Sequence, residues 1–381
     1  MELEFYKQFG NPESPGRKFS APARINIIGE HVDYLGGIVL PAAIDFSIDI
    51  VIRPNSSHVY RFYSENFKSF ITVSEIKKAE KNTWVNYILG VIDQLQKRNL
   101  TVPGFDLSMN GNIPQGAGLS SSAALEVVVG FALSTLYNFN LSRTEIALIG
   151  QAAENEFVGT KCGIMDQFII SQGKKNNCIS LNTNSLEFSY HQFDLQDKEF
   201  YLIQSNVKHS LKDSAYNTRR EECESALRKI QEINPNLENL YALEETFDLS
   251  KVSLSLEERK RVQHVLSEKN RTKNTIAGLL SQNFDLVGKS LYECHWSLSK
   301  NFEVSCPETD FIVETLQKES ILGARMIGGG FGGCVLVLDN KNSNKSYQSM
   351  LQDSYKNLFH KELSFYHFSI CDGVHEIGVQ S

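Results

Sequence analysis

The chain has 381 residues, of which 41% are hydrophobic and 22% charged, so it can bury a substantial core. Its formal net charge of −7 argues against a nucleic-acid-binding protein, which would need a broad basic face. The N-terminus lacks the basic start and apolar core of a signal peptide, and no run of about 18 apolar residues predicts a membrane span. The seven cysteines form no CxxC pair, so we expect free thiols and a cytoplasmic location.

In the first half of the chain, hydrophobic patterns alternate between strands and helices. Residues 38–62 are rich in Ile and Val and predict strands, and residues 107–112 predict a short strand that leads into a glycine turn. The nearly unbroken apolar run over residues 120–137 predicts a buried helix. A second helix is expected to begin at Ser142, which forms a capping box with Glu145, and to end at Gly159.

The second half has a different character. Residues 200–204 predict an apolar strand, and residues 213–283 are charged with a helical pattern. A helix over residues 310–318 is expected to precede a glycine cluster, and a strand over residues 334–338 to follow it. Strands and helices do not alternate regularly, so we expect a mixed α+β fold of two domains with a boundary near residues 180–200.

The first glycine-bearing motif spans residues 111–124 and combines glycines with three consecutive serines. A strand, a glycine turn and a helix start allow a phosphate to approach free backbone N–H groups. The interval from Gly111 to Gly116 nearly matches a P-loop, but Ala117 stands where that motif needs lysine. A serine N-cap is the simpler alternative, yet a cap needs only one serine, which favours a phosphate site.

A second glycine cluster covers residues 328–333 and contains a formal GxGxxG. With a helix expected before it and a strand after it, the order is the reverse of a dinucleotide-binding turn. A flexible loop is one interpretation. Five glycines in six residues cost backbone entropy, however, and a loop packed against a ligand or against the first motif explains that cost better.

Two further groups of acids carry candidate chemistry. Glu30, His31 and Asp33 form a dense polar segment that suits a ligand rich in hydroxyl groups, with a metal site and a solvated turn as alternatives. Asp166 is a single acid in an apolar stretch, where a salt bridge, a cap or a catalytic base would explain it. Glu154 is either an exposed surface acid or part of the same site.

Taken together, these segments resemble the GHMP family of small-molecule kinases, on its sugar-kinase branch. The likeness extends from residue 16 to about residue 340 and is carried by residues 21–34, 114–124, 205–210, 216–220, 304–308 and 324–333. It implies a ribosomal-protein-S5-like domain for ATP and sugar over residues 1–190, a ferredoxin-like domain over residues 191–381, and an active site between them. The implied reaction transfers the γ-phosphate of Mg·ATP to the C1 hydroxyl of galactose.

The resemblance also implies roles for individual residues. Asp166 would take the proton of the C1 hydroxyl, and Arg24 would pair with it and face the γ-phosphate. The implied sugar contacts are Glu30, His31, Asp33, Gly163 and Tyr216. The implied ATP contacts are Gly116, Ala117, Gly118, Leu119, Ser120, Ser121, Ser122, Ala123 and, near the adenine, Trp84. Ser122 and Glu154 would hold Mg²⁺.

Three other functions remain open at this point. The sugar could be a related one, such as N-acetylgalactosamine or arabinose. The chain could be a non-catalytic sensor of galactose and ATP, although Arg24, Ser122, Glu154 and Asp166 are all present. An oxidoreductase based on GxGxxG fits the expected context poorly. We expect a monomer that uses small molecules and has neither a nucleic-acid nor a membrane partner.

Overall fold

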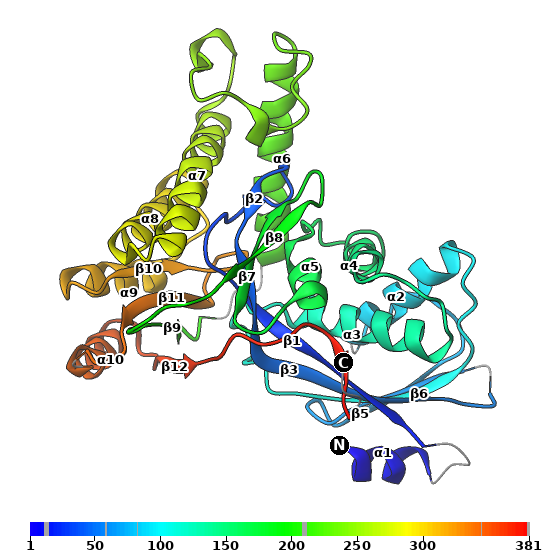
Figure 1. Cartoon of the computed structure of the whole chain (residues 1–381). Coiled ribbons are helices and arrows are strands. Elements are labelled where there is room, and N and C mark those ends of the chain that lie inside the picture. Colours follow the sequence, from blue (N-terminus) through cyan, green and yellow to red (C-terminus); the bar gives the residue numbers. More distant parts are fainter. Residues whose placement is uncertain (11–14, 58, 82, 208–211, 344, 379–381) are drawn as a thin grey trace.

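The computed structural model describes residues 1–10, 15–57, 59–81, 83–207, 212–343 and 345–378 (Figure 1). Its first part is built on a six-stranded sheet with the order β13-β1-β3-β6-β4-β5. Only β4 and β6 pair in parallel in this sheet as described. Its strands are β1 (Arg17–Asn26), β3 (Pro41–Pro54), β4 (Tyr60–Ser64), β5 (Ser69–Val73), β6 (Phe105–Gly111) and β13 (His375–Glu376).

Helices cover both faces of this sheet (Figure 1). On one face lie α2 (Val85–Lys97), α3 (Ser121–Leu136), α4 (Arg143–Ala152) and α5 (Met165–Gln172). The opposite face carries α1 (Glu2–Phe9), whose Phe5 and Phe9 pack against Val51 and Tyr63. Helix α3 packs on β1 and β3 and is buried on nearly all sides, as its unbroken apolar run predicted.

The capping box predicted at the start of α4 is confirmed. The hydroxyl of Ser142 accepts a hydrogen bond from the backbone of Glu145, and the Glu145 carboxylate accepts one from the backbone N–H of Ser142. The helix continues as a π-helical segment, η1 (Ala153–Val158), and ends at Gly159, which has a φ of 100°. This π segment turns Glu154 toward the interior of the molecule, where sequence periodicity alone had left its exposure open.

The second part of the chain contains a four-stranded antiparallel sheet with the order β10-β11-β9-β12, covered by helices α8, α9 and α10. Helices α6 and α7 pack on each other, α7 also packs on α8, and the ends of α6 and α7 that are joined by residues 232–255 project from the rest of the molecule (Figure 1). The strands are β9 (Lys198–Gln204), β10 (Gly323–Met326), β11 (Cys334–Asn340) and β12 (Ser364–His367). The helices are α6 (Lys212–Gln231), α7 (Leu256–Leu280), α8 (Phe284–Ser297), α9 (Pro307–Lys318) and α10 (Ser346–Phe359).

A small third sheet, with the order β2-β7-β8, joins the two parts. It consists of β2 (Ile38–Val39), β7 (Asn177–Asn182) and β8 (Phe188–Gln192). Beyond β12 the chain returns to the first part, where Cys371 and Val374 hydrogen-bond to the backbone of Ala43 and Ile170 before β13 pairs with β1. The two parts are therefore tied together by strands from both ends of the chain.

The structure differs from two sequence expectations for residues 307–338. The helix that was expected over residues 310–318 begins earlier, at Pro307, which occupies the first helical position. The glycine cluster is preceded by strand β10 and not by a helix, so it is the turn of a β10–β11 hairpin. Strand β10 has only four residues, too few for an alternating pattern to be recognised. A strand, β11, also follows the cluster, whereas a dinucleotide-binding turn leads into a helix.

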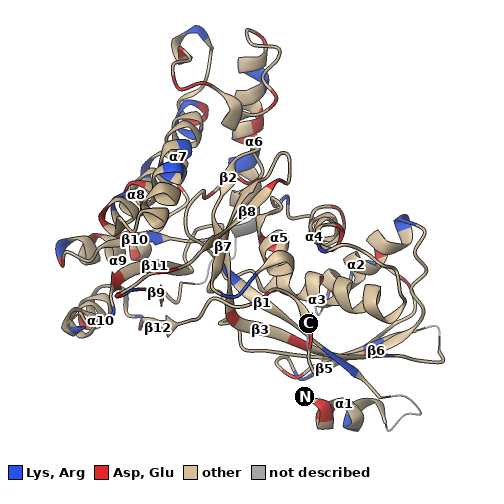
Figure 2. Cartoon of the chain, viewed as in Figure 1, with Lys and Arg blue, Asp and Glu red and all other residues tan. Residues whose placement is uncertain are grey.

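Charges of both signs are interspersed along the surface helices, most densely on α6 and α7 (Figure 2). Within the part of the chain that the structure describes, no helix is long and apolar enough to cross a membrane. All seven cysteines are free thiols, as the absence of paired spacings predicted.

Candidate functional site

A cavity of about 280 Å³ lies where β1, the start of α3, the start of α5 and the β10–β11 turn converge. Every charged group that the sequence assigned to a reaction lines it: Arg24, Glu30, Asp33, Glu154 and Asp166. These side chains come from segments up to 142 residues apart in sequence, counted between Arg24 and Asp166. The fold therefore brings together the two glycine motifs, the polar segment near residue 30 and the single acid of α5.

Arg24 and Asp166 form a two-point ion pair at the centre of this cavity. The Arg24 Nε donates to Asp166 Oδ1 at 2.8 Å, and Nη2 donates to Oδ2 at 2.9 Å. The third nitrogen, Nη1, donates to the carbonyl of Gly118 at 2.6 Å and so ties the pair to the first glycine motif. Arg24 is almost fully buried, whereas the Asp166 side chain is 29% exposed, so the carboxylate is the member of the pair that a ligand can reach.

The three serines of the first motif do not act as an ordinary helix cap. Ser120 occupies the N-cap position of α3 with a φ of 63°, but among the described residues it makes no side-chain capping hydrogen bond. Its hydroxyl donates instead to Oδ2 of Asp166. Gly116 and Gly118 both have φ near 70°, which only glycine adopts readily. This geometry supports the phosphate-site interpretation over the N-cap alternative.

The second glycine cluster packs against the first, as its entropy cost predicted. A Cβ atom at Gly328 would lie 2.9 Å from the Gly118 carbonyl oxygen, and one at Gly333 would lie 3.2 Å from that of Ala117. Four of these glycines have φ between 73° and 124°. Glycine is therefore required both for backbone conformation and for close approach between the two turns, and Gly328 and Gly329 also line the cavity.

Glu30 is held in place by Arg325 of β10. Nη1 of Arg325 donates to Glu30 Oε2 at 2.7 Å, while Nε donates to the carbonyl of Ile27 at 2.8 Å and Nη2 to that of Asn26. Burial raises the pKa of Glu30, and Arg325 and Arg24 oppose that shift. The result is a buried carboxylate at the cavity wall whose position is set by a guanidinium from the second half of the chain.

His31 is fixed by aromatic neighbours. Its ring lies between those of Tyr216, at a centroid distance of 5.3 Å, and Phe302, at 4.9 Å. Nδ1 lies 2.9 Å from the hydroxyl of Tyr34. His31 has a φ of 58°, a left-handed conformation that a non-glycine residue rarely adopts. No second histidine of the described chain joins it in a metal-binding cluster, so the metal alternative for this segment gains no support.

Asp33 lies against Gly163, where a Cβ atom would come within 2.0 Å of Asp33 Oδ2. A side chain at residue 163 would displace the carboxylate, so glycine is required here by contact and not by its φ. Burial, together with the charges of Asp166 and Glu30, raises the pKa of Asp33 to about 7. Three carboxylates thus share one cavity wall with a single pair of guanidinium groups.

Glu154 is buried beside a second carboxylate, that of Glu126 from α3. Nε2 of Gln167 donates to Oε2 of both, at 3.0 Å each. Burial raises the pKa of Glu126 well above its usual value, and Glu154 raises it further. The surface-acid alternative for Glu154 is therefore wrong, and its carboxylate lines the cavity together with Ser122.

Trp84 lies outside this cavity and lines an adjoining one of about 370 Å³. The two cavities share Tyr87, Ile113, Ser121 and Ser122, so the serine turn separates them. The Trp84 ring stacks on that of Phe67 at 6.3 Å. Apolar side chains such as Phe67, Trp84 and Met109 line this second cavity together with polar residues of the serine turn.

Among the predicted site residues, Ala123 is the one that lines neither cavity; its side chain is buried in the core at the start of α3. Lys208 and His209, within a segment that carried the family resemblance, lie outside the described residues. Sequence reasoning missed Tyr87, Thr160, Glu126 and Gln167. A signal existed for Glu126, since it is the only charged residue in the apolar run of α3.

Three family models match parts of this chain, and known proteins match nearly all of it. Residues 3–54 match the galactokinase galactose-binding signature, residues 86–174 the GHMP kinases N terminal domain, and residues 275–357 the GHMP kinases C terminal family. A galactokinase of Thermotoga petrophila is 44% identical over 366 residues, which cover 94% of this chain and all of the relative. One from Clostridium perfringens is 36% identical over 99% of each chain.

The fold is shared with solved structures. A galactokinase from Lactococcus lactis, complexed with galactose, superimposes with a TM-score of 0.94 at 34% identity and covers 99% of this chain and 98% of its own. A mevalonate kinase from Methanococcus jannaschii, at 20% identity and a TM-score of 0.65, shares the fold alone. The expected GHMP kinase fold is confirmed, and the chain belongs to the galactokinases of the GHMP kinase family.

Proposed function

We propose that this chain transfers the γ-phosphate of ATP to the C1 hydroxyl of galactose and releases galactose 1-phosphate and ADP. It is an ATP-dependent sugar kinase by family, and its relatives act on galactose. The observation that carries the assignment to the cavity is the two-point pair between Arg24 and Asp166. This pair lies between a polar sugar-type wall and a glycine–serine phosphate turn.

In this proposal Asp166 is the general base. As galactose O1 forms its bond to the γ-phosphorus and the bond to the β–γ bridging oxygen breaks, the C1 hydroxyl proton passes to an Asp166 carboxylate oxygen and ADP leaves. Arg24 orients that carboxylate and faces the negative charge of the transferred group, which suits a reaction that depends mainly on alignment and charge neutralisation.

Two carboxylates and one imidazole would form hydrogen bonds with the sugar hydroxyl groups. Glu30, His31 and Asp33 line one wall, and Tyr216 and Gly163 complete it. Arg325 holds the Glu30 carboxylate, which is therefore preorganised to accept hydrogen bonds from hydroxyl groups. Such positioning aims O1 at the γ-phosphorus and excludes alternative hydroxyls.

The phosphates of ATP would lie on the glycine turn and the start of α3. The residues proposed there are Gly116, Ala117, Gly118, Leu119, Ser120, Ser121, Ser122 and Ala123. All but Ala123 line the cavity, and the contribution of Ala123 would be its backbone N–H at the helix start. The adenine would occupy the adjoining pocket beside Trp84.

Mg²⁺ is proposed as the cofactor, with Ser122 and Glu154 as its protein ligands. Among the described residues no group of three acidic, histidine or cysteine side chains forms a complete metal cage. Two protein oxygens at the cavity wall fit Mg²⁺, which keeps waters and binds one or two carboxylates together with substrate phosphates. When bound, Mg²⁺ would neutralise phosphate charge.

The domain boundaries, the cellular location and the oligomeric state are also part of this proposal. We assign residues 1–190 to an ATP- and sugar-binding domain and residues 191–381 to a C-terminal domain whose last strand, β13, returns to the first sheet. The proposed state is a cytoplasmic monomer that uses only small-molecule substrates. The free thiols fit the reducing conditions of the cytoplasm.

A single assay tests the proposed function. ADP release is measured with ATP and Mg²⁺ across galactose, glucose, N-acetylgalactosamine and arabinose. Galactose is expected to give the largest kcat/KM. Preference for N-acetylgalactosamine or arabinose would reassign the substrate, and ligand binding without ADP release would indicate a sensor.

A further inference from the structure

Side chains of helix α7 form hydrogen bonds with the backbone of the loop that carries Glu30 and His31. Oε1 of Glu268 accepts a hydrogen bond from the backbone N–H of Gly29 at 2.9 Å and another from that of Glu30 at 3.1 Å. Glu268 is fully buried and lies 239 residues further along the chain than Gly29. The loop therefore depends on a side chain that the reaction itself does not use.

The carbonyl of Glu30 is also bound by α7. Nε2 of His264 lies 3.0 Å from this oxygen, and because a carbonyl only accepts, Nε2 must carry the proton. Burial lowers the pKa of His264 to about 4, so the ring is neutral and its Nδ1 accepts from the Ser297 hydroxyl at 2.9 Å. The His264 ring also packs on Phe302, which in turn packs on His31.

These contacts matter because the loop adopts a conformation that needs support. Gly29 has a φ of 90° and His31 a φ of 58°, so the left-handed region is used on both sides of Glu30. Buried backbone groups need hydrogen-bond partners, and α7 supplies them for the N–H of Gly29 and for both backbone groups of Glu30.

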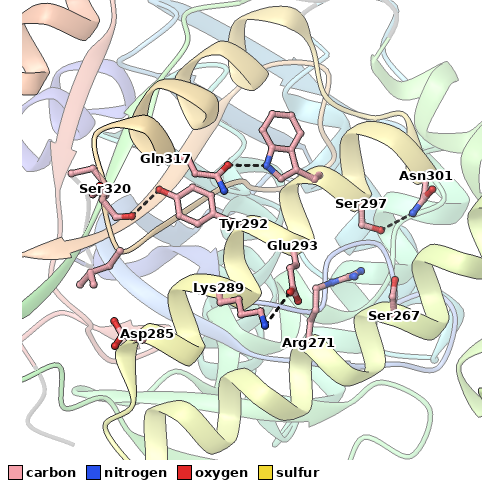
Figure 3. Close-up of a pocket in the computed structure, with 13 residues that line it drawn as sticks. Ser267, Arg271, Asp285, Lys289, Tyr292, Glu293, Ser297, Asn301, Gln317 and Ser320 are labelled. Atoms are coloured by element: carbon pink, nitrogen blue, oxygen red, sulfur yellow. Dashed lines mark hydrogen bonds and ion pairs between the residues drawn. The ribbon is translucent and has the colours of Figure 1, made fainter.

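Glu268 is itself fixed by an ion pair. Nε of Arg271 donates to Glu268 Oε2, and Cys294 Sγ lies 3.2 Å from Oε1. Although burial opposes ionisation, Arg271 and the nearby Arg325 lower the pKa of Glu268 to about 2, so both N–H groups meet an ionised acceptor. Arg271 lines an open cavity beside α7 and α8, together with Ser267 and Ser297 (Figure 3).

We propose that Glu268 and His264 are positioning residues for the sugar. They fix the backbone of Gly29 and Glu30 and thereby hold the Glu30 and His31 side chains at the wall where galactose is read. This inference deepens the proposed function and rests on it. It also gives a role to α7, which lines no part of the reaction cavity in the described chain.

Two double variants of Glu268 and Arg271 distinguish the effect of losing the acceptor oxygen from the effect of losing the ion pair. Both carry Arg271→Met; one adds Glu268→Gln, which keeps an oxygen for the two N–H groups, and the other adds Glu268→Met, which has nearly the same shape but no acceptor. Because a shift of the order of 1 Å in a positioned group costs up to about 100-fold, the methionine variant should raise the galactose KM by about 10- to 100-fold. The galactose KM of the glutamine variant should stay within about twofold of the parent value.

The ATP KM distinguishes positioning from general damage, because it should change in neither variant. Glu258→Met is the matched control: Glu258 is also a buried acid of α7 in an ion pair, here with Lys229, but it contacts Ser225, Lys229 and Ser255 instead of the loop. It should lower the melting temperature and leave the galactose KM unchanged. His264→Phe keeps the ring contact with Phe302 and loses the donor, so it tests the same idea if the methionine variant does not fold.

Two results would overturn the inference: equal galactose KM values for the glutamine and methionine variants, or parallel increases of the galactose and ATP KM values. For His264→Phe, an unchanged galactose KM would do the same. The parent chain tests the proposed function separately, by its own turnover of galactose. If the parent prefers another sugar of the panel, the variants are compared on that sugar, so the positioning role is tested in either case.

Discussion

Replacing Asp166 with asparagine removes one charge from the cavity and preserves its shape. In the parent chain, two nitrogens of Arg24 donate to the two carboxylate oxygens, at 2.8 and 2.9 Å, and Ser120 donates to one of them. Asparagine retains one oxygen, so Arg24 keeps one hydrogen bond and loses the other. Loss of a general base typically costs 10²- to 10⁴-fold, which corresponds to about 3–5 kcal/mol in the activation barrier.

The binding of both substrates should persist in this variant. Asparagine keeps the shape of the side chain and one acceptor oxygen beside Arg24 and Ser120, and the other groups that line the cavity are unchanged, so galactose and ATP dissociation constants measured by titration calorimetry should change little. Turnover is followed by ADP release under saturating substrates. Asp49→Asn serves as the matched control, because Asp49 is another partly buried acid that accepts a serine hydroxyl, from Ser20, away from the cavity. A loss of kcat smaller than about tenfold in Asp166→Asn would refute the general-base role.

Three other outcomes are expected. The raised pKa of Asp33, about 7, means that its favourable contribution to stability is present below its ordinary value of 3.8 and is lost as the pH rises to 7. The free energy of unfolding of the ligand-free Asp33→Asn protein, relative to that of the parent, should therefore be of the order of 4 kcal/mol more favourable at pH 8 than at pH 4, while the variant binds galactose poorly; an equal difference at both pH values in thermal unfolding would contradict this. ATP should change the tryptophan fluorescence through Trp84, so Trp296→Phe should retain the change and Trp84→Phe should lose it; the reverse pattern would place the base elsewhere. Glu154→Gln should raise the Mg²⁺ concentration for half-maximal rate by about tenfold or more, and an unchanged Mg²⁺ titration would remove Glu154 from the metal site.

Local rules predicted the parts of the fold that depend on neighbouring residues. The apolar run of α3 and the capping box of Ser142 and Glu145 were correct because each is decided within one or two helical turns. The packing of Gly328 against Gly118 could also be anticipated, since so many glycines need a close contact to justify their entropy cost. Strand β10 was missed because four residues carry no recognisable period.

The contacts of α7 with the loop of residues 29–31 could not be predicted from the same rules. His264, Glu268 and Arg271 share one face of α7, but their spacing is equally typical of charged residues on a solvated helix. What makes them buried is their packing against a loop more than 230 residues away. The first serine of the phosphate turn was similarly ambiguous, because an N-cap and a partner of Asp166 require the same hydroxyl.

The central claim is that this cavity brings the C1 oxygen of galactose to the γ-phosphorus of ATP, beside Asp166. Phosphorus NMR of the product formed from galactose, ATP and Mg²⁺ tests it directly, because the coupling of phosphorus to sugar protons identifies the phosphorylated carbon. We predict galactose 1-phosphate, formed in equal amount to ADP. A phosphate on another carbon, or ADP accompanied only by inorganic phosphate, would contradict the proposed geometry.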